Sequence, residues 1–178
     1  NPGGSLPKVL GEKDEKPGPA FYGAVLASPF GDALTLDFAR AAIQAEGLGQ
    51  DDVPDILSVS LSTHDYINHA YSPESRLSHD HLLQLDRLLQ AFFADLDRMV
   101  GKDRYVAVLT ADHGFSPAPE HSKAVGRNAG RQNTTELLAA INAALGQKSG
   151  DPKLVRGYSA SGVLLDGAAI AQKKLDRR

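Results

Sequence analysis

The chain has 178 residues and a formal net charge of -3, with 42% hydrophobic and 23% charged residues, a composition ordinary for a soluble globular protein. This charge balance argues against a protein that binds duplex nucleic acid through bulk positive charge. No apolar run approaches the roughly 18 residues needed to span a bilayer. The absence of cysteine excludes disulfides and thiolate ligands, so any metal must be held by histidine and carboxylate.

The first 20 residues are rich in proline, glycine and charge, and they show no hydrophobic period. We expect a flexible lead-in over residues 1–20 and one α/β domain over residues 21–178. The chain opens with Asn1 and Pro2, which is neither a start methionine nor a signal segment. We therefore expect it to be part of a longer protein.

Hydrophobic periodicity predicts the main elements in chain order. Helical spacing over residues 34–45 ends at Gly47, and the apolar run 56–61 is typical of a buried strand. A long helix then follows Ser72 and Pro73, with an apolar stripe formed by Leu82, Leu85, Leu89, Phe92, Phe93, Leu96 and Met99. A second buried strand is predicted at 105–109. Strand, helix and strand in this order form a βαβ unit, so we predict a largely parallel sheet flanked by helices.

The last third of the chain carries weaker signals. A loop over residues 116–132 is long enough to be a functional segment. The sequence from Asn133 to Glu136 resembles a capping box and predicts a helix over 137–145. A short strand at 163–165 and an amphipathic segment at 168–175 complete the expected elements.

Two Asp/His pairs directly follow the two predicted strands. Asp65 and His69 are four residues apart, which places them on one face if the chain there is helical, and Asp112 and His113 are adjacent in a turn. Alone, each pair is more often a local hydrogen bond or turn contact than a metal site. Together, at the carboxyl ends of two strands of one βαβ unit, they predict a site for divalent metal at the rim of the sheet.

Other polar residues rank below these pairs. His64 could support a neighbouring ligand but is more often structural, and His79 and His81 are expected to be surface or capping residues. Three hydroxyl groups near strand ends could be nucleophiles, although such groups usually satisfy the backbone; they are Ser62, Thr63 and Thr110. Three cations in the following loop could bind phosphate, although a solvated basic face is the commoner role; they are Lys123, Arg127 and Arg131.

The segments Ser-Thr-His-Asp-Tyr-Ile-Asn-His at residues 62–69 and Leu-Thr-Ala-Asp-His-Gly at residues 109–114, in this order around the long helix, resemble the alkaline phosphatase superfamily. The likeness is strongest to bacterial single-chain alkaline phosphatases and to type I phosphodiesterases and nucleotide pyrophosphatases. It extends from about Phe21 to the C-terminus.

The resemblance implies a periplasmic or secreted two-zinc phosphomonoesterase or phosphodiesterase acting on a small phosphate ester. It implies that Asp65 and His69 serve one zinc together with a histidine further downstream. Asp112 and His113 would serve the other zinc together with an N-terminal aspartate near a Thr or Ser nucleophile. Related sulfatases, phosphonate hydrolases and phosphoglycerate mutases remain alternatives, as does a non-catalytic interaction domain that retains the fold.

Two parts of that pattern have no counterpart in this sequence. No segment before Phe21 could supply the first aspartate and the nucleophile, and no histidine follows His121. We therefore expect the isolated chain to bind zinc weakly and to have no useful turnover. Self-association through exposed apolar surface is also expected, because an incomplete sheet leaves open edges.

Overall fold

The computed structural model describes residue 6, residue 10 and residues 16–150, 153–159 and 162–175. The chain divides into two compact units, Asn1–Arg127 and Asn128–Arg178. Most of the lead-in predicted for residues 1–20 lies outside the described residues. The single domain predicted for residues 21–178 stays a prediction.

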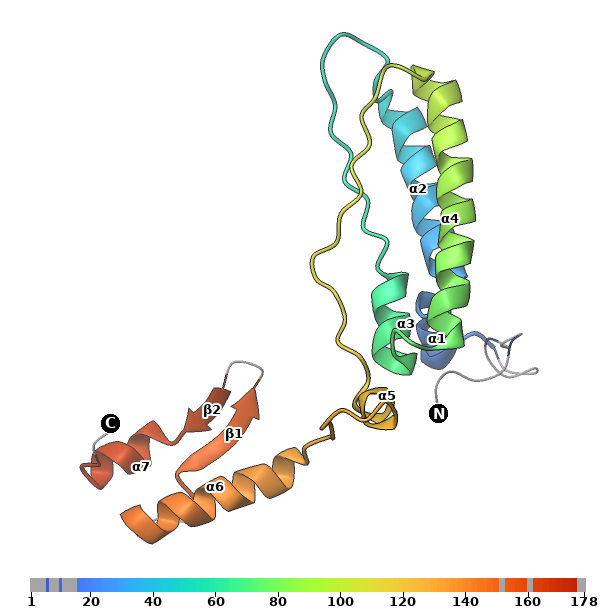
Figure 1. Cartoon of the computed structure of the whole chain (residues 1–178). Helices are drawn as coiled ribbons and strands as arrows, with labels where there is room; N and C mark the ends of the chain where they lie inside the picture. Colours follow the sequence, from blue (N-terminus) through green and yellow to red (C-terminus); the bar gives the residue numbers. More distant parts are fainter. Residues whose placement is uncertain (1–5, 7–9, 11–15, 151–152, 160–161, 176–178) are drawn as a thin grey trace. The chain divides into compact units, whose positions relative to one another are not determined.

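The first unit begins with two helices, α1 (Pro19–Leu26) and α2 (Pro29–Glu46) (Figure 1). Proline occupies the first position of each helix, where its missing N–H costs nothing. Gly47 ends α2 in the left-handed conformation, with φ of 63°. The helix predicted over 34–45 is therefore confirmed, and it starts one and a half turns earlier than its apolar period shows.

Two further helices follow, α3 (Thr63–Tyr71) and α4 (Arg76–Leu96). The Ser75 side chain accepts a hydrogen bond from the Ser78 N–H and caps α4. A single π-helical turn, Asp97–Gly101, continues α4 to the glycine predicted as its end. The long amphipathic helix predicted from the leucine and phenylalanine stripe is confirmed.

Helices α2 and α4 lie side by side, and the core of the unit lies between them (Figure 1). Its fully buried members are Leu36, Ala39, Ile43 and Phe92. The Arg40 guanidinium lies 5.4 Å from the centre of the Phe92 ring and donates a 2.6 Å hydrogen bond to Asp95. A cation–π contact and an ion pair thus link α2 to α4.

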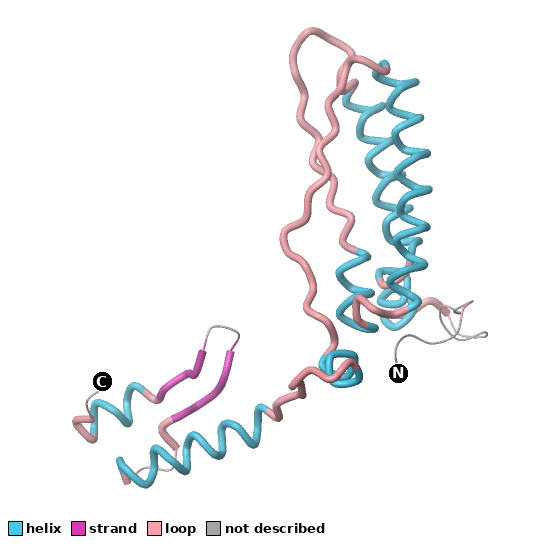
Figure 2. The backbone as a smooth tube through the Cα atoms, in the orientation of Figure 1, coloured by secondary structure: helices cyan, strands magenta, loops and turns pink. Residues whose placement is uncertain are grey.

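Residues 51–62 and 102–118 form two long segments without regular structure (Figure 2). Neither of the strands predicted at 56–61 and 105–109 pairs with another strand among the described residues, so the predicted parallel sheet is not formed there. Their side chains are largely exposed, with Ile56 at 93% and Val106 at 91%. An apolar run indicates burial, but a strand also needs a neighbouring strand for its backbone hydrogen bonds, and none is present here.

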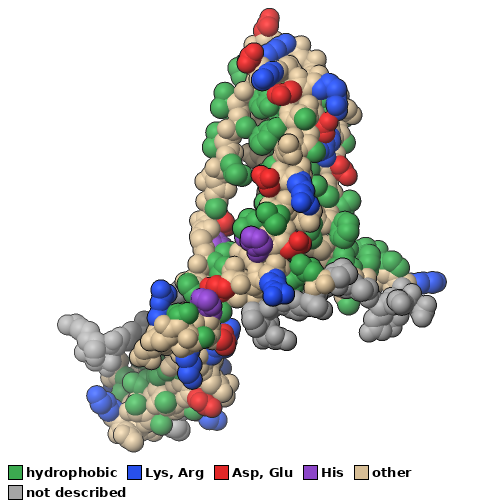
Figure 3. All heavy atoms as spheres, turned by 45° about the vertical axis from the view of Figure 1, so that its right-hand side comes forward, with side chains coloured by type: hydrophobic (Ala, Val, Ile, Leu, Met, Phe, Trp, Pro, Cys, Tyr) green, Lys and Arg blue, Asp and Glu red, His purple; other side chains and the backbone are tan. Residues whose placement is uncertain are grey.

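The first extended segment contacts the helix pair, because Val59 and Leu61 pack against its core. A hollow of about 810 Å³ is lined by Leu36, Leu89 and Phe92 from the helices and by Leu57 and Val106 from the extended segments. The hollow is open to solvent, and Figure 3 shows hydrophobic side chains at the surface of this unit. The exposed apolar surface expected from the sequence is present. Self-association through this surface stays a prediction.

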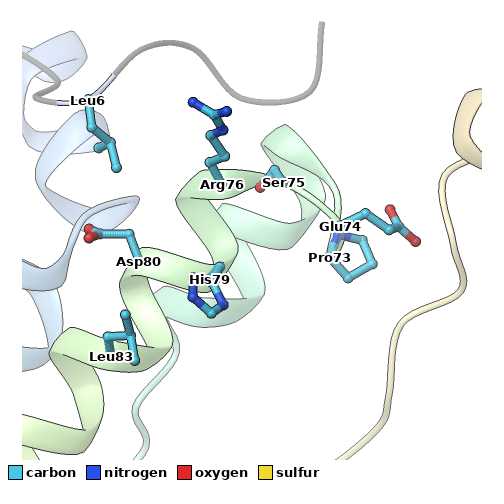
Figure 4. Close-up of a pocket in the computed structure, with 8 residues that line it drawn as sticks. All are labelled: Leu6, Pro73, Glu74, Ser75, Arg76, His79, Asp80 and Leu83. Atoms are coloured by element: carbon cyan, nitrogen blue, oxygen red, sulfur yellow. The ribbon is translucent and has the colours of Figure 1, made fainter.

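The remaining helix of the first unit is short. Helix α5 (Pro119–Ala124) lies within the loop predicted at 116–132, and the Ala118 N–H before it donates to the Glu74 carboxylate at 3.4 Å. Glu74 also lines a hollow of about 590 Å³ at the start of α4, together with Arg76, His79 and Asp80 (Figure 4). This hollow contains none of the four predicted metal ligands.

The second unit contains α6 (Thr134–Ser149), β1 (Val155–Ser159), β2 (Gly162–Leu165) and α7 (Gly167–Gln172). The two strands are antiparallel, and the predicted strand at 163–165 lies within β2. The Asn133 side chain accepts hydrogen bonds from the Thr135 and Glu136 N–H groups, and its own amide donates to the Glu136 carboxylate. The predicted cap of this helix is confirmed, with Asn133 as the capping residue.

No helix in the described part of the chain is long and apolar enough to cross a membrane.

Candidate metal centre

Helix α3 carries the first predicted ligand pair. Asp65 lies in its first turn and His69 in its last, and the Nε2 atom of His69 is 3.4 Å from the Oδ1 atom of Asp65. The helical turn assumed from the spacing of the pair is therefore present. The distance is longer than a good hydrogen bond, so the two groups share a face without pairing closely.

The second pair lies in the loop after residues 105–111. His113 Nδ1 is 2.9 Å from the Gly114 carbonyl oxygen and donates to it, which leaves Nε2 as the ring nitrogen with a free lone pair in neutral His113. The Asp112 carboxylate accepts a hydrogen bond from the His113 N–H at 3.0 Å, and its side chain is 91% exposed. A backbone contact thus orients the imidazole in the way that metal-binding histidines require.

The two pairs meet at Asp65. The Nε2 atom of His113 is 3.5 Å from Asp65 Oδ1, so this oxygen faces ring nitrogens from both segments. The Phe115 ring contacts both imidazoles edge-on, with centroid separations of 5.1 Å to His69 and 5.2 Å to His113. The structure therefore brings together Asp65, His69 and His113, with Asp112 at the margin.

The electrostatics of this cluster favour a cation. Asp65 Oδ1 is buried and has no hydrogen-bond partner, and Asn68 Oδ1 on the same helix is in the same condition. The Gly114 carbonyl, with the Asp112 and Asp65 carboxylates, raises the pKa of His113 above its ordinary value. A buried carboxylate oxygen without a partner is costly, and a proton or a metal ion would satisfy it.

The donor set fits a divalent metal. Two ligand atoms on one tetrahedral zinc lie roughly 3.3 Å apart when each bond is about 2.0–2.1 Å long. The separations of 3.4 and 3.5 Å from Asp65 Oδ1 are close to that value. Among the described residues, however, no three or more such side chains are arranged to hold one ion. The Asp65–His69 separation therefore fits two ligands of one ion, which would need further partners, while His113 and Asp112 are 3.8 Å apart and His113 also faces Asp65.

The prediction that His81 is a surface or capping residue is wrong. Its side chain is 1% exposed, and its Nε2 atom is 2.9 Å from the Asp32 carboxylate, which is equally buried. Each residue lies on the apolar face of its helix: Asp32 is one turn before Leu36, and His81 is three turns before Phe92. A polar residue on an apolar stripe must find a buried partner, and that signal was present in the sequence.

The remaining candidates of the first unit are exposed or make other contacts. Thr63 is buried at the start of α3, and the hydroxyls of Ser60 and Ser62 are 2.9 Å apart. His79 is exposed, as predicted, and Lys123 and Arg127 are exposed as well. No described contact links these hydroxyls or cations to Asp65, and their proposed roles stay predictions.

His64 precedes Asp65 and is half-buried. Its Nδ1 atom is 3.1 Å from Nδ1 of His81. Burial and the neighbouring His81 lower the pKa of His64, against the opposing effects of Asp32 and Asp65. The neutral imidazole is therefore favoured at this position.

The sequence of this chain matches a known protein family. Residues 12–161 match the family model of type I phosphodiesterase / nucleotide pyrophosphatase, and the chain belongs to that family, within the alkaline phosphatase superfamily. The resemblance seen in the two Asp/His segments is confirmed.

The chain is similar in sequence to several alkaline phosphatases. The chain is 36% identical over 154 residues to alkaline phosphatase PafA of Elizabethkingia meningoseptica. The aligned region covers 86% of this chain and 28% of the relative. The chain is 46% identical over 98 residues to alkaline phosphatase PhoV of Synechococcus elongatus, covering 55% of this chain and 18% of the relative. The chain thus spans less than a third of the length of these relatives.

The structure gives the same relationship. A crystal structure of wild-type PafA superposes with a TM-score of 0.79 at 35% sequence identity, covering 88% of this chain and 29% of that one. The α/β class predicted for this chain is that of these structural relatives, although the described residues themselves contain only the antiparallel pair β1 and β2.

Proposed function

We propose that the protein hydrolyses phosphate esters, as a phosphomonoesterase or phosphodiesterase, and that this chain supplies part of a two-zinc site. The observation that carries the proposal is the convergence of His69 and His113 on the unpartnered oxygen of Asp65. The alkaline phosphatase names of several relatives support the reaction class. Because the chain covers only part of those relatives, the activity of the whole protein is part of the proposal.

Each pair has a separate role in this proposal. Asp65 and His69 would hold one zinc, and Asp112 and His113 the other. Bound in this way, the two ions would supply charge stabilisation for the attacking and leaving oxygens of an in-line phosphoryl displacement. The Gly114 carbonyl holds the His113 ring so that Nε2 faces Asp65, and α3 holds His69 one turn from Asp65.

Phe115 contacts both histidines. Its ring meets each imidazole edge-on, which restricts their rotation. The nucleophile is proposed to lie outside the matched residues of this chain, as is the remaining ligand of each zinc. A periplasmic or secreted location accompanies the family resemblance and is likewise proposed.

Zinc titration by calorimetry tests the assignment. We expect weak binding by this chain, and we expect Asp112→Ala/His113→Ala to abolish it. The matched control is Asp86→Ala/His79→Ala, which removes an exposed aspartate and an exposed histidine from α4 and should leave binding unchanged. Binding that is indifferent to the first double substitution would refute the assignment. Metal-dependent turnover of a phosphate ester by this chain alone would refute the expectation that it is inactive in isolation.

A further inference from the structure

A buried polar chain links α2, α4 and α3 immediately beside the candidate ligands. Asp32 on α2 and His81 on α4 are each 1% exposed, and their Oδ2 and Nε2 atoms are 2.9 Å apart. On its other side, His81 Nδ1 is 3.1 Å from Nδ1 of His64. His64 is the second residue of α3, and Asp65 is the third.

The two imidazoles are joined by a hydrogen bond in the plane of the rings. Their planes differ by 23°, and their centroids are 5.2 Å apart while the two Nδ1 atoms are 3.1 Å apart. Because the nitrogens are much closer than the centroids, the rings meet edge to edge. One proton must therefore lie between the two Nδ1 atoms, and a second lies on His81 Nε2, where it is donated to the Asp32 carboxylate.

The other oxygen of Asp32 reaches the start of α3. Oδ1 accepts a hydrogen bond from the Thr63 N–H at 3.4 Å. Thr63 is the first residue of α3, and a first-turn N–H has no acceptor within its own helix. Asp32 therefore contacts the beginning of α3 twice, once directly at Thr63 and once through His81 and His64.

Helices α2 and α3 pack closely at this junction. A Cβ atom at Gly31 would lie 2.6 Å from the Thr63 hydroxyl oxygen and 3.2 Å from the Val25 carbonyl oxygen. The absence of a side chain at Gly31 thus allows α2 to approach α3 closely enough for Asp32 to reach Thr63. Buried polar groups with all partners in place specify one arrangement, because any other arrangement leaves a group unsatisfied.

We propose that Asp32, His81 and His64 are positioning residues that fix the first turn of α3, and thereby the Asp65 carboxylate, for metal binding. The role of these residues in metal binding rests on the proposed function. The hydrogen-bonded chain Asp32–His81–His64, called the relay below, can be tested without any metal. Asp32 and His81 contact no candidate ligand directly; they act through Thr63 and His64. Groups that contact a ligand directly typically change metal affinity by roughly 10- to 100-fold when removed, and these residues act one contact further away.

The isosteric variant Asp32→Asn gives a specific spectroscopic prediction. The Thr63 N–H needs an acceptor, so the Asn carbonyl oxygen takes the Oδ1 position and its NH₂ group faces His81. Nε2 of His81 must then accept rather than donate, which moves its proton to Nδ1. His64 Nδ1 in turn becomes an acceptor, and His64 carries its proton on Nε2.

Nitrogen NMR of histidine rings in the metal-free protein distinguishes these states. We expect His81 to be protonated at Nε2 in the wild type and at Nδ1 alone in Asp32→Asn, with His64 changing to the Nε2-protonated form. His79→Gln, an exposed histidine of α4, and Asp37→Asn, an exposed aspartate of α2, should change neither signal. A His81 ring that keeps its Nε2 proton in Asp32→Asn would overturn the relay.

Zinc affinity tests the positioning role. We expect Asp32→Asn and His64→Ala each to weaken binding, by up to roughly 10-fold, with faster amide exchange in α3, while the two control variants bind as the wild type does. His64→Ala keeps the test available if Asp32→Asn does not fold. Unchanged zinc affinity and unchanged α3 exchange in the folded variants would overturn the proposal. If Asp65→Ala leaves zinc binding intact, the proposed metal site fails instead, and the relay is judged by the tautomers and by α3 exchange.

Discussion

Replacing Gly31 by alanine tests the close contact between α2 and α3. Alanine normally stabilises a helix by at most about 1 kcal/mol relative to glycine. At Gly31 the added Cβ would lie 2.6 Å from the Thr63 hydroxyl and 3.2 Å from a backbone carbonyl, so a buried β-branched residue or the backbone must move. Overpacking of this kind costs about 1–3 kcal/mol. We therefore expect a net destabilisation of about 0–2 kcal/mol.

Gly23→Ala in α1 provides the matched control, because no atom beyond the adjacent residues and the backbone of its own helix lies within 4 Å of a Cβ at that position. This variant should gain up to about 1 kcal/mol, so the two substitutions should differ by about 1–3 kcal/mol. Urea unfolding followed by circular dichroism measures both, with the midpoint compared at constant slope. Equal shifts of the two midpoints would refute the packing argument.

Three further predictions concern the core, a helix cap and the ligand cluster. Leu36→Ala should lower the free energy of unfolding by about 2–5 kcal/mol, because the side chain is buried. Leu34→Ala, at a position 61% exposed on the same helix, should change it by less than about 0.5 kcal/mol. Similar midpoints of urea unfolding for the two variants would contradict the assigned core. Asn133→Ala should destabilise α6 by about 1 kcal/mol, measured by amide exchange of that helix, and an unchanged exchange rate would show that the cap contributes nothing. The raised pKa of His113 means that its proton is held more tightly than in a free imidazole, so zinc binding should weaken as pH falls through that raised pKa. In the metal-free protein, NMR titration should place the pKa of His113 lower in Asp112→Asn than in the wild type, because one of the groups that raise it is gone. A His113 pKa that is the same in both proteins would contradict the electrostatic account.

The sequence was sufficient to locate α2, α4 and α6 and to place Asp65 and His69 on one face of α3, because these features depend on local spacing. The apolar period of α4 and the four-residue separation of Asp65 and His69 determine which residues share a face, whatever surrounds them. The capping chemistry of Asn133 is local in the same sense. These predictions needed no knowledge of partners distant in sequence.

Features that depend on distant partners were harder to predict. The runs 56–61 and 105–109 have strand composition, but ladder formation requires a neighbour that the described residues do not supply. The burial of His81 depends on Asp32, 49 residues earlier in the chain. Its position on the stripe that includes Phe92 was visible in the sequence, but its partner could be identified only from the structure.

The length of α3 links the candidate site to folding. With nine residues it is below the roughly 12–15 residues at which an isolated helix becomes even marginally stable in water, so its geometry depends on the packing of α2 and α4. Any ion held by Asp65 and His69 would bind only the folded helix and would stabilise it in turn. By mass action this amounts to about 2.7 kcal/mol at a free-ion concentration 100 times the dissociation constant. A metal ion bound at this helix would therefore stabilise the fold of the first unit, whatever reaction it serves.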